Sequence, residues 1–235
     1  MKKILFLTVL FLLNHSYSQK KYSFDYALVY NFTSSKQKKT SQFLYFVNSK
    51  DNSYFQTAQL KDSLNYEIRL VDQQGVATLS SLPKNDLYKS ETINFSCKNV
   101  SNYESLGKNK INDYYFQIEK DTLINDTLYS HYTLKNNKGI RYIKRKNIPT
   151  AHFIVEKNSP NFLPFLPQSI MYEEWISNSK IPFGLAKMIY FTNPDGTWFS
   201  TYQLVSSLKS NRFATIPNEC DYTVDEIRKD HKKRL

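Results

Sequence analysis

Residues 22–32 read YSFDYALVYNF, and this stretch decides the fold class of the chain. Apolar side chains occupy every second position, with polar residues such as Ser23, Asp25 and Asn31 between them. Successive side chains of a β-strand point to opposite faces, so this spacing predicts a strand with one apolar face. The composition agrees, because tyrosine and phenylalanine favour strands and the chain has 18 Tyr, 16 Phe and 5 Gly among its 235 residues.

Shorter strand patterns follow along the chain, separated by polar turns. They cover residues 42–47, 53–59, 66–71, 76–79, 92–97, 113–118, 123–124, 127–134, 140–144, 151–156, 185–192 and 197–208. Turns are expected at 33–41, at 83–86, at Gly75 and at 193–196, where Asn-Pro-Asp-Gly is a strong hairpin signal. The whole pattern predicts a mainly β protein with a single antiparallel curved sheet, as a half-barrel or barrel-like sandwich.

The segment 159–184 departs from the strand pattern because prolines frame its apolar side chains. A proline at its start suits a short helix over residues 167–177. The expected buried face of this helix carries Ile170, Met171 and Trp175, and the expected solvent face carries Glu173 and Glu174.

Two interpretations of this proline-framed segment are open. It closes one end of the core as a plug, or it covers the open face of the curved sheet as a lid over an apolar pocket. In the lid interpretation, the candidate ligand-binding side chains are Phe162, Phe165, Met171 and Trp175.

The N-terminus predicts export. Two lysines precede an apolar run over residues 4–13, and small residues at 16 and 18 suit cleavage after Ser18. The apolar run is shorter than the roughly 20 residues of a membrane-spanning helix, and no later segment reaches that length. We expect a protein of the periplasm or the cell exterior, with a signal peptide at 1–18, a β-rich exported domain at 19–224 and a charged tail at 225–235.

Two cysteines, Cys97 and Cys220, lie far apart in the sequence. In an oxidising compartment the simplest expectation for such a pair is a disulfide. Two unpaired buried thiols are the alternative, and no CxxC spacing supports a redox or metal role.

The chain is basic, with a formal net charge of +11. Outside the cytoplasm, such a charge favours anionic envelope components over nucleic acid as partners. The lysines are dispersed through polar turns, which favours a solvated surface over a binding patch.

The motifs of common catalytic chemistries are missing from the sequence, which has no GxSxG, HExxH, P-loop or GxGxxG pattern. His131 and His152 lie in expected strands and would need distant acids to bind a metal. Glu173 and Glu174 are neighbours, whereas the two acids of a glycosidase face each other across a cleft. The sequence therefore assigns no catalytic residue, no metal and no cofactor, and it favours a non-enzymatic function.

Residues 181–189, IPFGLAKMI, resemble the signature of the GLPGLI family, small uncharacterised exported proteins of Bacteroidetes-type bacteria. A β-rich exported chain with an apolar lid also resembles the lipoprotein-carrier half-barrel, whose curved sheet and helices enclose acyl chains. The first resemblance implies export, and the second implies a lipid or other apolar ligand. Neither assigns a ligand-binding or catalytic residue.

These observations lead to one main hypothesis, an exported non-enzymatic protein that binds an apolar or amphipathic envelope molecule. One alternative is a basic surface that binds an acidic glycan or a partner protein. The other is an envelope hydrolase. A nucleic-acid partner and a membrane-spanning segment are not expected.

Overall fold

The computed structural model describes residues 19–103, 108–178 and 180–220. The expected signal peptide at 1–18 and the expected charged tail at 225–235 lie outside these residues. Within them, no helix is long and apolar enough to cross a membrane.

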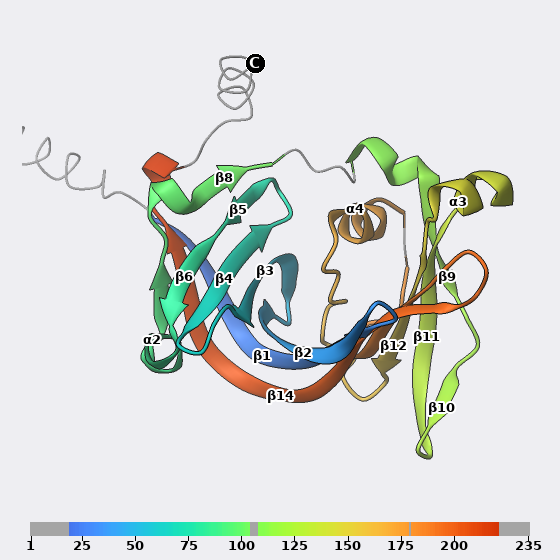
Figure 1. Ribbon diagram of the computed structural model, residues 1–235, viewed down its shortest axis with the longest axis horizontal. Coiled ribbons are helices and arrows are strands. Elements are labelled where there is room, and N and C mark those ends of the chain that lie inside the picture. The colour runs from blue at the N-terminus through green and yellow to red at the C-terminus, as the bar shows by residue number, and fades with distance from the viewer. Residues whose placement is uncertain (1–18, 104–107, 179, 221–235) are drawn as a thin grey trace, which may run out of the picture.

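A single 14-stranded sheet makes up most of the structure and bends into the deep U of Figure 1. Its strands are β1 (Lys20–Ser34), β2 (Gln37–Asn48), β3 (Asp51–Leu60), β4 (Asn65–Asp72), β5 (Val76–Thr78), β6 (Ser80–Pro83), β7 (Thr92–Asn94), β8 (Val100–Asn102), β9 (Tyr114–Ile118), β10 (Thr122–Ile124), β11 (Thr127–Asn136), β12 (Thr150–Glu156), β13 (Ala186–Thr192) and β14 (Trp198–Ile216). The main path runs β10-β11-β12-β13-β14-β1-β2-β3-β4-β5-β8, with β6 on β4, β7 on β14 and β9 on β11. All these pairs are antiparallel except β7 with β14. The sheet is open, which confirms the predicted mainly β fold with a curved antiparallel sheet.

Few helices accompany the sheet in the described residues. They are the α-helices α2 (Lys84–Lys89), α3 (Ile140–Lys146) and α4 (Ser169–Asn178) and the 3₁₀ turns η1 (Cys97–Asn99), η2 (Lys108–Asp113) and η3 (Asn218–Cys220). In Figure 1, α4 lies inside the U, between its two arms, and α3 lies at the outer end of the arm formed by β9 and β11. The predicted helix at 167–177 is therefore confirmed within two residues at its start and one at its end.

The strand β1 confirms the pattern that predicted it, but its apolar side chains do not share one core. Phe24 packs in one hydrophobic cluster and Tyr26 packs against another. The pairing of β1 with β14 shifts register between these two residues. An irregularity of this kind turns a strand and re-aims its side chains, so one alternating segment serves both cores.

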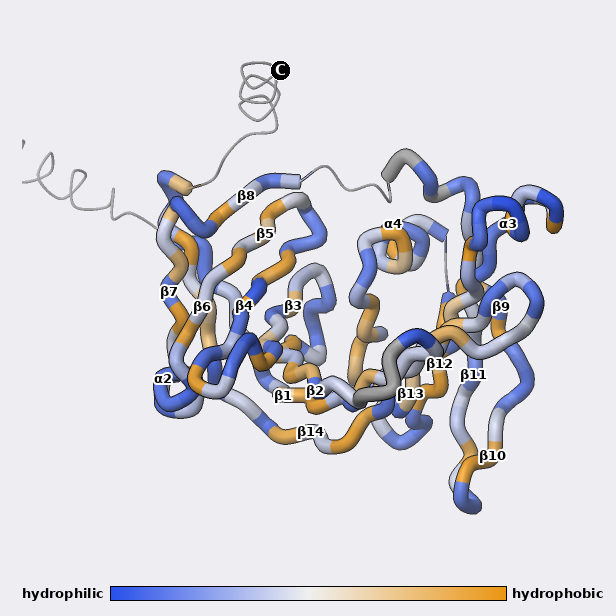
Figure 2. Tube along the Cα trace, viewed as in Figure 1, coloured by the Kyte–Doolittle hydropathy of each residue, from blue (hydrophilic) through white to orange (hydrophobic). Residues whose placement is uncertain are grey.

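The two cores occupy different parts of the U. The α4 cluster is built around α4 and includes Leu28, Tyr30, Tyr45, Phe153, Phe165 and Met171. The disulfide cluster lies at the other arm and includes Tyr22, Phe24, Phe46, Ile68, Leu70, Ala214 and Cys220. In Figure 2, orange hydrophobic stretches alternate with blue ones along the strands of both arms, as expected for a sheet whose two faces differ in burial.

Cys97 and Cys220 form a disulfide with an S–S distance of 1.98 Å, as the sequence predicts. The bond joins η1 to η3 across 123 residues of sequence. Its sulfur atoms belong to the disulfide cluster, with Cys220 fully buried. The bond thus attaches the end of β14 to the arm that contains β7 and β8.

Some turns follow the prediction closely. Gly75 has a φ of +113° between β4 and β5, and Gly196 has a φ of +84° between β13 and β14. These are conformations in which a residue without a Cβ is favoured. The Asn193 amide N–H donates to the Thr197 carbonyl at 2.8 Å and closes the second hairpin.

Three local predictions are wrong. The expected turn at 33–41 is a two-residue turn, Ser35-Lys36, because β2 begins at Gln37. Residues 83–86, expected as a turn, contain the end of β6 and the first turn of α2, which buries Leu87. The expected strand at 140–144 is the helix α3, which ends at Asn147 in the left-handed conformation. A short apolar–polar alternation cannot by itself distinguish a strand from one or two helical turns.

Candidate functional site

The proline-framed segment lies inside the U and is tied to both arms by hydrogen bonds. The Leu163 N–H donates to the Ser49 carbonyl of the β2–β3 turn at 2.8 Å. On the other side, the Ser159 hydroxyl donates to the Glu156 carbonyl at the end of β12 at 3.3 Å. Two side-chain amides also donate to this segment, from Asn52 to the Pro164 carbonyl at 2.9 Å and from Gln73 to the Leu166 carbonyl at 3.2 Å. These bonds satisfy backbone groups that the prolines leave outside regular structure.

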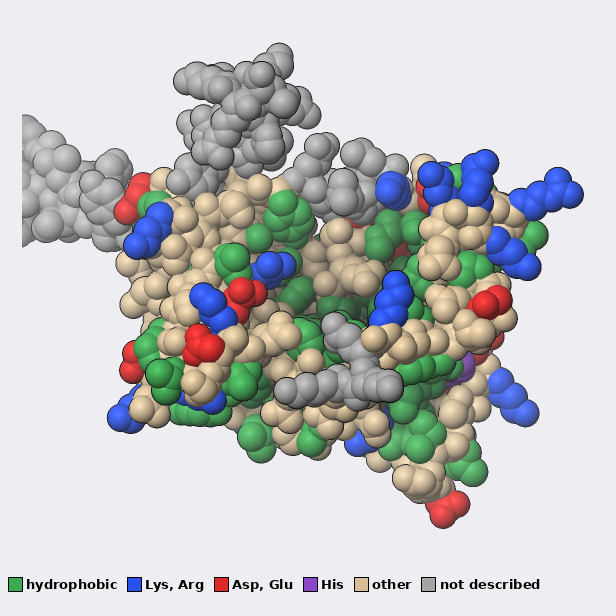
Figure 3. All heavy atoms as spheres, viewed as in Figure 1, with side chains coloured by type: hydrophobic (Ala, Val, Ile, Leu, Met, Phe, Trp, Pro, Cys, Tyr) green, Lys and Arg blue, Asp and Glu red, His purple; other side chains and the backbone are tan. Residues whose placement is uncertain are grey.

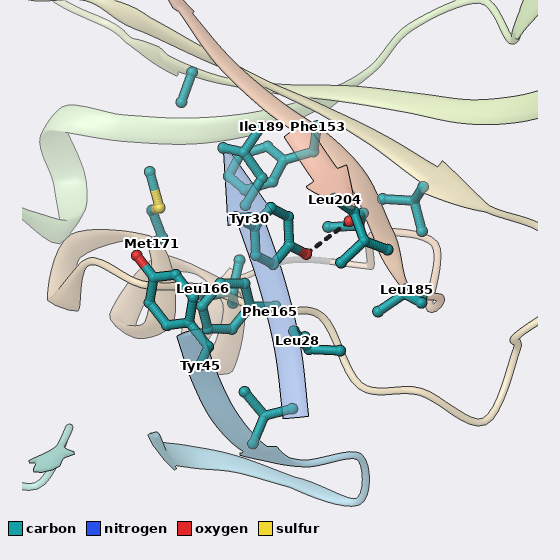
Figure 4. Close-up of a cluster of buried hydrophobic side chains, with 14 of the residues drawn as sticks. Leu28, Tyr30, Tyr45, Phe153, Phe165, Leu166, Met171, Leu185, Ile189 and Leu204 are labelled. Atoms are coloured by element: carbon teal, nitrogen blue, oxygen red, sulfur yellow. Dashed lines mark hydrogen bonds between the residues drawn. The ribbon is translucent and has the colours of Figure 1, made fainter. Parts of the chain in front are cut away.

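Phe165 fills the bottom of the U. Its ring centroid lies 4.9 Å from that of Tyr45, 5.8 Å from that of Phe55 and 6.0 Å from that of Tyr30. Figure 4 shows the ring beside Tyr30 and Tyr45, below the buried side chains of β13 and β14. Phe162 is also buried, with its ring 5.2 Å from that of Tyr26. This half of the segment packs as a plug.

Helix α4 packs its predicted apolar face against the core, but it does not expose its predicted acidic face. Glu173 and Glu174 are only 6% and 2% exposed, whereas Ile176 is 52% exposed, so the expected solvated acidic face is wrong. Glu174 accepts a hydrogen bond from the Asn178 side chain at 3.2 Å. The helix lies between the two arms of the U, so more than one of its faces meets protein (Figure 1). A simple two-sided pattern assumes a helix on an open surface.

Several polar side chains lie around Asp72 on the disulfide arm. Burial, followed by the charges of Asp72 and Glu173, raises the pKa of Tyr103 to about 12. The Tyr103 hydroxyl donates to the Asp72 carbonyl at 3.0 Å. The Asp72 side chain is itself buried, where it pairs with Lys20 at 2.8 Å and accepts from the Tyr22 hydroxyl at 2.9 Å. These contacts form a polar cluster on the disulfide arm.

An apolar cavity of about 300 Å³ lies between the start of α4 and the arm of the U that contains β11, β12 and β13. The start of α4 and the strands β1, β11, β12, β13 and β14 all contribute to it. Lining side chains include Ile170, Met171, Phe32, Phe191, Phe199 and Tyr202. Hydrophobic side chains are visible in the hollow at the middle of Figure 3.

Of the four candidate side chains from the sequence, Met171 alone lines this cavity. Phe162 and Phe165 pack in the plug, and Trp175 lies half-buried with its ring 6.1 Å from that of Tyr172. The four residues belong to one segment of the sequence, but in the structure they pack in different places along that segment.

Aromatic residues of the strands, which the sequence analysis did not assign to a site, form the opposite wall. Phe32 and Tyr202 face each other across the β1–β14 pairing, with ring centroids 4.7 Å apart. Burial raises the pKa of Tyr202, so its hydroxyl stays neutral and can donate a hydrogen bond. Both residues lie in predicted strands. Their place in a site was missed because the sequence did not show that these two strands pair.

A second hollow, of about 510 Å³, is polar and lies where the β2–β3 turn meets the start of the proline-framed segment and β14. Asp25, Lys50 and Lys209 are among its lining residues. The Asp25 carboxylate accepts from the Ser49 N–H at 2.7 Å and from its hydroxyl at 2.5 Å. The two lysines are therefore its available charged groups for a ligand.

His131 and His152 lie together on adjacent strands, with Nε2 of the first 3.4 Å from Nδ1 of the second. His152 also stacks on Tyr190 at 4.3 Å and contacts the Thr192 hydroxyl at 3.0 Å. Burial, and then the charge of His131, lowers the pKa of His152 to about 4. No group of three or more metal-ligating side chains occurs in the part of the chain that the structure describes.

No known protein family matches the sequence, so the GLPGLI resemblance has no support beyond its few residues, and no curated protein matches it either. Several solved structures are similar to this chain at low identity and low TM-score. MucB of Pseudomonas aeruginosa, in its complex with MucA, is 6% identical with a TM-score of 0.43, over 86% of this chain and 54% of that one. This chain thus spans about half the length of MucB.

Two further structures are similar over most of their length. An uncharacterised conserved protein of Thermus thermophilus is 7% identical with a TM-score of 0.42, over 87% of this chain and 88% of that one. A LolA-superfamily protein of Nitrosomonas europaea is 9% identical with a TM-score of 0.29, over 87% of this chain and 89% of that one. Similarity at this level assigns no ligand or partner to the present chain.

Proposed function

We propose that this protein is an exported, non-enzymatic binding protein that takes the apolar part of an envelope molecule into the cavity between α4 and the sheet. The apolar cavity of about 300 Å³ is the observation that supports this function. Ligand sites are concave, largely apolar and carry a few polar groups, with volumes of about 300–1,000 Å³. Gln168, Ser200 and the hydroxyls of Tyr114 and Tyr202 are the polar groups among the lining side chains.

The disulfide supports the exported location in this proposal, because disulfides persist in oxidising compartments. In the same proposal, residues 1–18 act as the signal peptide, residues 19–224 form the exported domain and residues 225–235 form a charged tail. The plug residues Phe162 and Phe165 belong to the same hydrophobic cluster as Met171, and Met171 contacts the ligand.

A cavity-filling substitution tests the proposal directly. Ala151 is buried in β12 and lines the cavity, so Ala151→Leu adds its extra carbons to the space that a ligand would occupy. We expect this variant to bind the neutral dye Nile red roughly tenfold more weakly, which corresponds to about 1.4 kcal/mol. Fluorescence titration gives the affinity, and chemical denaturation shows whether the variant is folded.

The matched control is Ala77→Leu in β5, where the alanine is half-buried on the disulfide arm and does not line the cavity. It should leave Nile red affinity unchanged. If the unmodified protein does not bind the dye, or if both folded variants bind it equally well, the proposed site is wrong.

The polar hollow favours a second candidate function, the binding of an acidic glycan at the surface. Lys50 and Lys209 flank this hollow, and their charges would attract sulfate or carboxylate groups. Lys50→Gln with Lys209→Gln should then abolish binding of a sulfated oligosaccharide, and about 0.5 M salt should weaken it in the unmodified protein by screening. Oligosaccharide binding that survives both changes would contradict this second function.

A further inference from the structure

We infer that the ligand of the apolar cavity is a single-chain amphiphile with an acidic head group, and that Lys36 and Lys144 hold this head group at the mouth of the cavity. The inference rests on the proposed function, since it names the chemistry of the ligand for the same cavity. It is based on a polar hollow that adjoins the apolar one and on the charge of the residues around it.

The adjoining hollow has a volume of about 360 Å³. Lys36 contributes from the β1–β2 turn, Lys144 from the last turn of α3, and Asn193 and Asp195 from the β13–β14 turn. Three turns therefore meet at one end of the sheet. The Ser35 N–H donates to the Phe199 carbonyl at 2.9 Å and fixes the first turn against β14.

The polar and apolar hollows adjoin each other and share part of their walls. Phe199 lines both of them. Asn147 lines the polar hollow, and the next residue, Ile148, lines the apolar one. A molecule whose chain occupies the apolar cavity between Ile148 and Phe199 would thus place its polar end in the hollow that contains the two lysines.

The charges at this mouth favour an anion. Lys36 and Lys144 are exposed, and neither forms one of the ion pairs found among the described residues. Asp195 is the acid in the hollow, and its carboxylate already accepts from the Thr197 N–H at 2.9 Å and from the Thr197 hydroxyl at 2.6 Å. Its single negative charge offsets one of the two lysines and leaves a net positive charge.

The end of α3 adds to this positive charge. Arg145 and Lys146 follow Lys144 in the last turn of the helix. Together they outweigh the partial negative charge of a helix C-terminus. Figure 1 shows α3 at the upper right of the molecule, and Figure 3 shows Lys and Arg side chains gathered in the same place.

The size of the cavity limits the apolar part of the ligand. At about 300 Å³ it lies at the lower end of the range for ligand sites, which suits one acyl chain and is too small for a lipid with two. A carboxylate and a phosphate monoester share the required head-group chemistry. The free fatty acid and the single-chain phosphate are therefore the two sources to compare.

The experiment measures how dodecanoate, dodecyl phosphate and dodecanol displace Nile red, because the three ligands share a chain and differ in the head group. We expect both anions to bind about three- to tenfold more tightly than dodecanol at low ionic strength, the range for one or two partly exposed charge interactions. The preference should decrease in about 0.5 M salt because screening weakens exposed charge interactions.

Replacing both mouth lysines, Lys36→Gln with Lys144→Gln, should remove the preference for the anions and leave dodecanol affinity unchanged. The matched control replaces Lys89 and Lys98 with Gln, since both are exposed and lie on the disulfide arm. It removes the same total charge and should keep the preference.

The outcomes separate the inference from the proposed function. If Nile red and dodecanol bind but the anions show no advantage, or if the Lys36 and Lys144 variant keeps that advantage, the acidic head group is wrong and the apolar site stands. If the folded, unmodified protein binds neither the dye nor dodecanol, the proposed function fails and the inference fails with it. A preference for one anion over the other identifies which of the two sources suits the mouth.

Discussion

Replacing Phe165 with alanine should destabilise the protein strongly, because this ring is the centre of the plug. Its side chain is 6% exposed and contacts the rings of Tyr30, Tyr45 and Phe55, which come from three neighbouring strands. The substitution removes the contacts with all three at once. The carbonyls of Pro164 and Leu166, on either side of Phe165, accept hydrogen bonds from the disulfide arm, so the segment is not free to move inward and fill the space.

The expected cost follows from burial and packing. Burying a phenylalanine side chain contributes about 1.5–3 kcal/mol, and the cavity left by its truncation brings the usual Phe→Ala cost in a core to about 3–5 kcal/mol. Edge-to-face ring pairs each add about 0.5–1.5 kcal/mol, which places Phe165→Ala in the upper part of that range. Since domains are stable by about 5–15 kcal/mol in total, the variant would lose a large fraction of its stability.

Urea denaturation measures this cost through the transition midpoint and its slope. Phe183→Ala is the matched control, because Phe183 lies in the same segment and is 45% exposed. Its cost should be below about 1 kcal/mol. Equal costs for the two variants would refute the plug and would mean that the segment rests on the sheet as a loosely packed lid.

Three further predictions concern the rest of the fold. Replacing Cys97 and Cys220 together with alanine should lower the free energy of unfolding by about 4–5 kcal/mol in the chain-entropy model. A denaturation midpoint that stays the same after the substitution or after reduction would contradict this. Because the folded pKa of His152 is about 4 and an unfolded histidine titrates near 6.5, the unfolded state binds the proton first as the pH falls. Stability should then decrease from about pH 6.5 to 4, by roughly 1–2 kcal/mol after allowance for the half-exposed ring, and His152→Gln should flatten that part of the curve. Gly184→Ala should cost about 1–3 kcal/mol or more, because Gly184 has a φ of +144° and an added Cβ would collide with the Glu156 carbonyl oxygen. A thermal unfolding midpoint equal to that of the unmodified protein would contradict this.

The features that follow from local chemistry were predictable. Alternation at every second residue predicted β1, and short apolar segments predicted much of β2, β3 and β12. Gly75 was identified because a tight turn between two such segments needs a positive φ. Each of these predictions depends on residues that lie within a few positions of one another in the sequence, where local steric effects set the backbone conformation.

Helices of one or two turns were harder to predict. The residues around Ile140 and Tyr142 alternate as they would in a strand. They nevertheless form the helix α3, with Gly139 as its N-cap and Asn147 as its C-cap. In α4, the acidic pair at 173 and 174 is buried because the helix lies inside the U, where other parts of the chain surround it. Burial depends on what surrounds an element, and its own residues carry little of that information.

The sequence by itself determined the class of fold, the disulfide partners and the position of one proline-framed segment within a sheet. Only the tertiary structure decided which part of that segment is a plug and where the cavity lies. The cavity joins Phe32 near the start of the chain, Met171 in α4 and Tyr202 near its end. The order in which the strands pair brings these residues together, and side chains this distant meet only when the sheet has curved around α4, which is a property of the whole packed chain.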